Sequence, residues 1–271
     1  ITDGEAGTAT DITAANLTLT ANTTGQTVGT VSNPLELSLS GTVTASVNLG
    51  TGGVFLTETN QMTISATGID AGTGNVVLNA PSFIINGDIT GNNIDIDATG
   101  AADGIVTMAD GAEIISPSGV ISIDATRNIT LGSVSTGNST ANAISIVTTG
   151  GSISDGGDTH RDIIANSAGA VVTLTAATGI GSGNALETTV ATLDASVTGT
   201  GSLEINEADT IDLKDLDTFN GLITISAGGQ LTATDVDSSN TNNDANDISL
   251  TTTSGNVVLG VVTAGTVNDV T

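Results

Sequence analysis

The sequence predicts an all-β protein, a right-handed parallel β-helix (β-solenoid) of about ten to twelve coils with essentially no helix. Three observations predict this fold. Apolar and polar residues alternate in short runs, as in half-buried strands. Short polar stretches with Gly, Asn or Asp separate the runs and favour turns. The runs recur along the chain at intervals of 18 to 31 residues, near the length of one solenoid coil.

Each coil is expected to begin with an apolar-polar-apolar triplet. A second apolar position follows eight residues later, as Met62 follows Val54 and Ile84 follows Val76. A third, weaker apolar site often comes next, for example Ile89, which predicts three short strands per coil. The triplets begin at Leu17, Leu35, Val54, Val76, Ile94, Ile121, Ile144, Val172, Leu203, Ile223 and Ile248.

Composition supports an ordered β-protein with a narrow core. The chain has 271 residues, of which 38% are hydrophobic, so it has enough apolar material to fold. Its Val, Ile and Thr residues and its 35 glycines suit strands and turns and disfavour helices. Aromatic residues make up only 1% of the chain, which argues against the alternative of a β-sandwich or barrel.

Charge excludes several classes of partner. The chain has three basic residues and 29 acidic ones, and its formal charge of −26 would repel nucleic acid and anionic membrane surfaces. No apolar run approaches the roughly 18 residues of a membrane span. Because cysteine is absent, disulfides, thiolate metal sites and cysteine nucleophiles are excluded.

A longer repeat of about 150 residues contains the coils. The phrase GSLEINEADTIDL at 201–213 has its apolar residues at the same intervals as GVFLTETNQMTIS at 53–65. Likewise ITDG at 1–4 matches ISDG at 153–156, and SNPLE at 32–36 matches GNALE at 183–187. We therefore divide one continuous solenoid into a first copy at 1–152 and a second, incomplete copy at 153–271. We expect the chain to be a section of a longer array, or a subunit that behaves like one.

One acidic loop is a candidate calcium site. The stretch DVDSSNTNNDAND at 235–247 offers Asp235, Asp237, Asp244 and Asp247 with neighbouring Ser and Asn oxygens, the hard ligands that Ca²⁺ prefers. The glycine of an EF-hand loop is missing, so a flexible surface loop is the favoured interpretation and weak Ca²⁺ binding is the alternative. Apart from Ca²⁺, no cofactor is expected.

The stretch DGGDTHRD at 155–162 is the one enzyme-like cluster. It gathers Asp155, Asp158, His160, Arg161 and Asp162, residue types that polysaccharide lyases and hydrolases use. The matching stretch of the first copy, DGEAGTATD, has neither His nor Arg. A solvated turn is therefore the favoured interpretation, and we assign no catalytic residue and expect no enzyme.

Several phrases resemble the repeat region of filamentous-haemagglutinin-like giant exoproteins. They are NITLGSVSTG at 128–137, GLITISAGGQLTA at 221–233, SNPLE at 32–36 and TGIGSGNALE at 178–187. The resemblance implies a non-catalytic rod segment of a fibre or adhesin, located outside the cell or on the bacterial surface. It also implies more solenoid repeats of the same chain, or identical subunits, placed end to end. The receptor is not indicated. The alternative is a β-helical domain that processes or binds polysaccharide.

Overall fold

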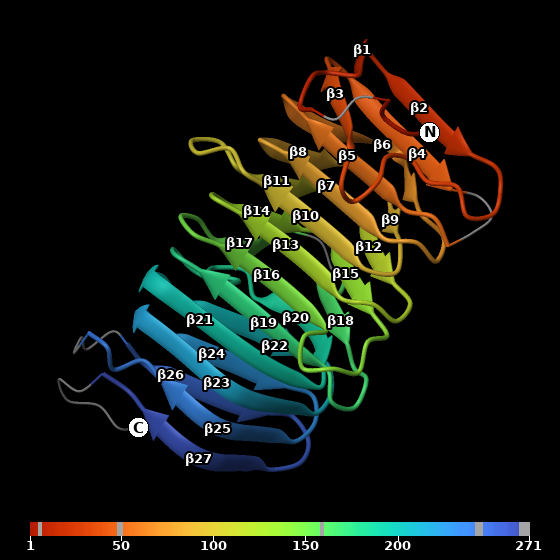
Figure 1. Ribbon diagram of the computed structural model, residues 1–271. Helices are drawn as coiled ribbons and strands as arrows, with labels where there is room; N and C mark the ends of the chain where they lie inside the picture. The colour runs from red at the N-terminus through yellow and green to blue at the C-terminus, as the bar shows by residue number, and fades with distance from the viewer. Residues whose placement is uncertain (5–6, 48–50, 158–159, 242–245, 266–271) are drawn as a thin grey trace.

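The computed structural model describes residues 1–4, 7–47, 51–157, 160–241 and 246–265. These residues form a β-solenoid of about 11 turns, with β1 (Ile12–Ala14) and β27 (Val257–Thr263) at opposite ends of the stack (Figure 1). They contain no helix, and so none long and apolar enough to cross a membrane. The all-β, parallel solenoid predicted from the sequence is confirmed.

Two sheets of parallel strands form the walls of the solenoid. The first sheet has twelve strands and receives one strand from each coil. Because every neighbouring pair in it is parallel, each coil hydrogen-bonds to the coils before and after it. Its strands are β1, β3 (Leu35–Leu39), β5 (Val54–Glu58), β7 (Val76–Ala80), β10 (Ile94–Ala98), β13 (Ile121–Ala125), β16 (Ile144–Thr148), β19 (Val171–Ala176), β21 (Thr192–Thr200), β23 (Ile211–Asn220), β25 (Leu231–Asp237) and β27.

The second sheet has fifteen strands, because several central coils contribute two strands to it. The strands are β2 (Leu17–Ala21), β4 (Thr42–Val47), β6 (Gln61–Asp70), β8 (Ser82–Ile85), β9 (Ile89–Thr90), β11 (Val106–Met108), β12 (Glu113–Ser116), β14 (Ile129–Leu131), β15 (Ser133–Thr136), β17 (Ile153–Asp155), β18 (Ile163–Ala165), β20 (Leu186–Val190), β22 (Leu203–Glu207), β24 (Ile223–Ala227) and β26 (Ile248–Thr252).

The second sheet divides in the middle of the rod. The ten-residue strand β6 pairs with β8 through residues 61–64 and with β9 through residues 69–70. Between the two segments Gly68 takes a φ of +82°, which lets the strand bend where an L side chain would be strained. The expected three strands per coil are therefore present in the central coils, whereas the coils nearer the ends have two.

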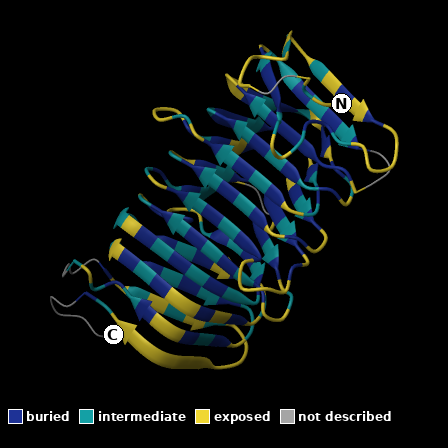
Figure 2. Ribbon diagram, viewed as in Figure 1, coloured by how far each residue is buried: buried dark blue, intermediate teal, exposed yellow. Residues whose placement is uncertain are grey.

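Rows of aliphatic side chains run along the inside of the solenoid. In the first sheet Leu56, Leu78, Ile96, Ile123 and Ile146 stand in register on successive strands, and each is fully buried. Except for Phe55, the buried apolar residues of the described chain belong to one continuous core. Figure 2 shows the resulting alternation of buried and half-buried residues along the strands in the middle of the stack. This alternation is what the period-two pattern of the sequence predicts.

One predicted core position is wrong. Ile84 is only half-buried, whereas its neighbours Phe83 and Ile85 are fully buried. The turn between β7 and β8 consists of Pro81 alone, while the turn between β13 and β14 has three residues, so the eight-residue spacing does not apply here.

The two copies of the long repeat place matching residues on opposite sheets. Val54 lies on β5 of the first sheet, but its counterpart Leu203 lies on β22 of the second sheet. Conversely, Met62 lies on β6 of the second sheet and Ile211 on β23 of the first. The repeat therefore spans a whole number of coils plus about half a coil.

Candidate cation-binding sites

The predicted calcium ligands that the structure describes lie on one strand and directly before the next. Asp235 and Asp237 lie on β25 of the first sheet, and Asp247 immediately precedes β26 of the second sheet. Asp244 lies outside the described residues. The Asp237 carboxylate accepts a 2.6 Å hydrogen bond from the Ser239 N–H, which closes a local turn. This calcium loop stays a prediction.

Among the described residues, carboxylates gather in threes at other places. Three groups have one oxygen of each residue within 4.8 Å of the others. We call them the N-terminal acidic site (Asp3, Asp11 and Glu36), the central acidic site (Asp155, Asp162 and Glu187) and the sheet acidic cluster (Asp95, Asp97 and Asp124).

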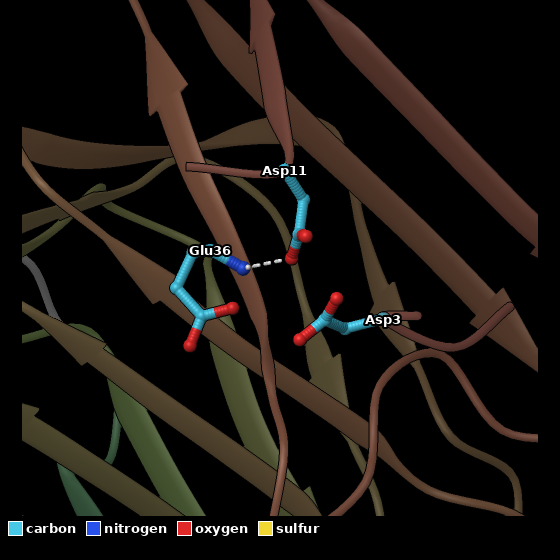
Figure 3. A group of neighbouring side chains, drawn as sticks. All are labelled: Asp3, Asp11 and Glu36. Atoms are coloured by element: carbon cyan, nitrogen blue, oxygen red, sulfur yellow. Dashed lines mark hydrogen bonds between the residues drawn. The ribbon is translucent and has the colours of Figure 1, made fainter. Parts of the chain in front are cut away.

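The N-terminal acidic site joins two neighbouring coils to the segment before them. Asp11 directly precedes β1, and Glu36 lies on the adjacent strand β3. The backbone N–H of Asp11 donates to the Glu36 carbonyl oxygen at 2.8 Å, and the N–H of Glu36 donates to Asp11 Oδ2 at 2.9 Å. The Asp3 carboxylate faces the same space (Figure 3), where its Oδ2 accepts a 2.7 Å hydrogen bond from Asn33 Nδ2.

Glu36 is the buried member of this site. It is 6% exposed, and its Oε2 has no hydrogen-bond partner among the described residues. Burial raises the pKa of Glu36, and the neighbouring carboxyls of Asp11 and Asp3 raise it further. Three acidic groups thus share a small space in which at least one of them is shielded from water.

The central acidic site has the same construction. The N–H of Asp162 donates to the Glu187 carbonyl oxygen at 2.8 Å, and the N–H of Glu187 donates to Asp162 Oδ2 at 2.8 Å. Asn184 Nδ2 donates to Asp155 Oδ2, as Asn33 does to Asp3. Glu187 Oε2 is enclosed and has no hydrogen-bond partner in the described part of the chain.

Each residue of the central acidic site lies 151 or 152 positions after its counterpart in the N-terminal acidic site, by direct subtraction of their numbers. The two sites are thus products of the long repeat. They lie on different walls, however, because β1 and β3 belong to the first sheet whereas β18 and β20 belong to the second.

The sheet acidic cluster is of a different kind. Asp97 and Asp124 are side by side in register on β10 and β13, and Asp95 lies two residues before Asp97 on the same strand. All three are only half-buried. Burial raises the pKa of Asp95 and of Asp97, and their acidic neighbours raise both further. The cluster has no enclosed oxygen that lacks a partner in the described residues.

Two other buried glutamates show how this fold satisfies a carboxylate without an ion. Glu58 accepts hydrogen bonds from the N–H groups of Leu39 and Asn60, each at 3.1 Å. In the second copy Glu207 accepts from the Val190 N–H at 3.0 Å and the Thr188 hydroxyl at 2.8 Å. Burial raises the pKa of Glu207 to about 7.

The enzyme-like cluster is divided in the structure. Asp155 and Asp162 belong to the central acidic site, and Asp158 lies outside the described residues. His160 and Arg161 line a pocket of about 380 Å³ together with Glu113. The His160 ring is 63% exposed and its Nδ1 lies 3.4 Å from Asp110 Oδ1. Because the His160 ring is largely exposed, this pocket does not bury the imidazole that could act as an acid or base.

Sequence reasoning overlooked both acidic sites, although their signal was present. The matched phrases ITDG and ISDG, and SNPLE and GNALE, contain Asp3, Asp155, Glu36 and Glu187 at equivalent positions. Only the coiling of the chain shows that residues 25 positions apart, such as Asp11 and Glu36, are neighbours on adjacent strands.

Comparison of the chain with protein families, with curated proteins and with solved structures gives no match in any of the three.

Proposed function

We propose that this protein is a rod segment of a bacterial cell-surface or extracellular fibre, of the kind that forms the shaft of filamentous-haemagglutinin-like exoproteins. It would act by length and stiffness and would catalyse no reaction. One uninterrupted core and two continuous parallel sheets support this role, because such a stack has no internal hinge between domains.

The open end of the core is the observation that carries the proposal. On β27, Leu259 and Val262 continue the inward rows of the first sheet, yet they are 57% and 37% exposed. With Ile248 and Leu250 of β26 they line an open groove of about 600 Å³. Figure 2 shows β27 as a continuous exposed band at this end of the stack.

A further solenoid coil is the partner that suits this end. Among the described strands β27 is the last of the first sheet, and its outer edge offers backbone groups for parallel strand addition. More repeats of the same chain, or an identical subunit, would bury the exposed aliphatic side chains. The charge of −26 opposes contact between two copies at low salt.

Light scattering on the 271-residue chain tests this proposal. The average molar mass should rise with protein concentration. The rise should be larger at about 0.5 M salt than at about 0.02 M, because salt screens the repulsion between two acidic copies. Leu259→Asp should keep the chain monomeric. Val120→Asp, at an exposed apolar residue in the middle of the rod, is the matched control and should behave as the wild type. A wild-type monomer under all these conditions would contradict end-to-end association.

For the alternative, a polysaccharide-processing domain, the candidate site among the described residues is the pocket with Glu113, His160 and Arg161. A carboxylate and an imidazole are suitable acid and base groups, and the arginine could bind an acidic sugar. Depolymerisation of acidic polysaccharides that is lost in Glu113→Gln would favour this alternative over the rod.

A further inference from the structure

The two acidic sites present an electrostatic problem that a bound ion would solve. Three carboxylates within 4.8 Å of one another repel strongly when they are ionised, and more so where water is excluded. Each site therefore needs either shared protons or a cation. The charge of the whole chain favours cation uptake as well.

We propose that the N-terminal and central acidic sites each bind one Ca²⁺ ion. This inference is independent of the rod function proposed above and concerns residues other than those of the predicted calcium loop.

Glu36 is the strongest single indication of a ligand. The residue is 94% buried, and its enclosed Oε2 has no hydrogen-bond partner among the residues described. The equally buried Glu58 and Glu207 differ, because N–H and O–H donors surround them. A buried carboxylate oxygen without a donor is costly unless a cation or a proton binds it.

The recurrence of the site is the second, independent observation. Asp155, Asp162 and Glu187 reproduce the site with the same reciprocal backbone bonds and the same Asn contact. The first sheet forms one site and the second sheet forms the other, so the surrounding strands differ. The acidic triad is thus a unit that both copies retain in different settings.

The donor set selects the ion. All the ligand groups are carboxylate oxygens, the hard donors that suit Ca²⁺ and Mg²⁺, and neither site includes the His or Cys residues that favour Zn²⁺. The ligands come from three separate segments of the chain and not from one preformed loop. Ca²⁺ accepts a wide range of ligand geometries, whereas Mg²⁺ demands a near-ideal octahedron, so we assign Ca²⁺.

The bound ion would connect coils that the sheets join only by strand pairing. Asp11 and Glu36 belong to adjacent coils, and Asp3 belongs to the segment that precedes β1. In the second copy Asp155 ends β17, while Asp162 and Glu187 belong to neighbouring coils. Each ion would therefore link three segments at one corner of the solenoid.

Isothermal titration calorimetry with CaCl₂ tests this proposal on the whole chain after dialysis against EDTA. At about 0.15 M NaCl, which screens diffuse binding, we expect each of the two acidic sites to bind Ca²⁺ saturably with a Kd of about 10⁻⁵ to 10⁻³ M. Mg²⁺ should bind at least about tenfold more weakly. Glu36→Gln should abolish binding at the N-terminal acidic site, and Glu187→Gln should abolish binding at the central acidic site. The double variant should lose both.

The matched control is Asp95→Asn with Asp97→Asn, which removes the same charge from the sheet acidic cluster and should leave both sites. Circular dichroism melts in EDTA must show that each variant is folded. If Glu36→Gln is not folded, Asp3→Asn, in the segment outside the sheets, gives the same test. Absence of saturable binding up to about 10 mM Ca²⁺, or two sites remaining in the double variant, would overturn the proposal.

Discussion

Val236 and Val262 occupy the same inward row of the first sheet, one coil apart, and are in direct register. Val236 is fully buried, whereas Val262 is 37% exposed. The two side chains and their strand environments are alike, so the difference comes from the next coil, which covers β25 and is missing over β27 among the described residues. Burial in this solenoid is therefore supplied by the neighbouring coil and not by the strand itself.

The largest expected effect comes from placing an aspartate in a coil that its neighbours cover, and it is compared with an aspartate placed on the uncovered strand β27. Ile205 is 1% exposed and lies between Leu186 and Ile225 of the adjacent coils. Ile205→Asp removes its buried apolar surface and places a charge in a dry core, so the free energy of unfolding should fall by more than about 4 kcal/mol. Urea denaturation followed by circular dichroism measures this change.

Leu259→Asp is the matched variant on β27 and should change the free energy of unfolding by less than about 0.5 kcal/mol. Equal losses in the two variants would mean that coverage by a neighbouring coil does not decide the cost.

Burial between coils also changes the pKa of ionisable groups, and this predicts a pH-dependent change in stability of intermediate size. The pKa of Glu207 is about 7 in the folded chain and 4.5 when unperturbed, so between these values the folded state retains a proton that the unfolded state has released. The free energy of unfolding should therefore fall as the pH rises from 4.5 to about 7, by about 2 kcal/mol after allowance for solvent screening. Denaturant titrations at a series of pH values measure the slope.

Glu207→Gln should reduce that slope, because Gln does not titrate. A variant with the wild-type slope would assign the pH dependence to other carboxyls, such as Asp217, whose pKa burial also raises.

The smallest expected effect comes from adding one hydroxyl group to the row of side chains that contains Val236 and Val262. Val236→Thr buries a hydroxyl without an assured partner and should lower the free energy of unfolding by about 1 to 2 kcal/mol. Val262→Thr makes the same change at the partly exposed position and should cost less than about 0.5 kcal/mol. If end-to-end association covers β27, the cost at Val262 should rise with protein concentration, which thermal melts at two concentrations would detect.

The strands could be predicted from the sequence because each buries only one face. Alternation located the inward residues, and the third apolar position Ile89 is buried as expected. The error at Ile84 arose in a turn of one residue, where spacing alone gives no guide. Turn lengths vary between coils, so they limit the accuracy of such predictions.

The relation between the two repeat copies could not be read from the pattern. Both sheets present the same apolar alternation to the same core, so a strand of one is indistinguishable in sequence from a strand of the other. The acidic sites were missed for a related reason. Asp11 and Glu36 lie far apart in the sequence and become neighbours only when the chain between them completes one turn of the solenoid.

Because the long repeat spans a whole number of coils plus about half a coil, consecutive copies place matching residues on opposite walls of the solenoid. Any feature that recurs once per copy, such as an acidic site, is carried to the opposite wall in the next copy. In an extended array of such copies, identical patches would alternate between the two sides of the rod and return to the same side after about 300 residues. Such an array would carry the same motif on both of its walls.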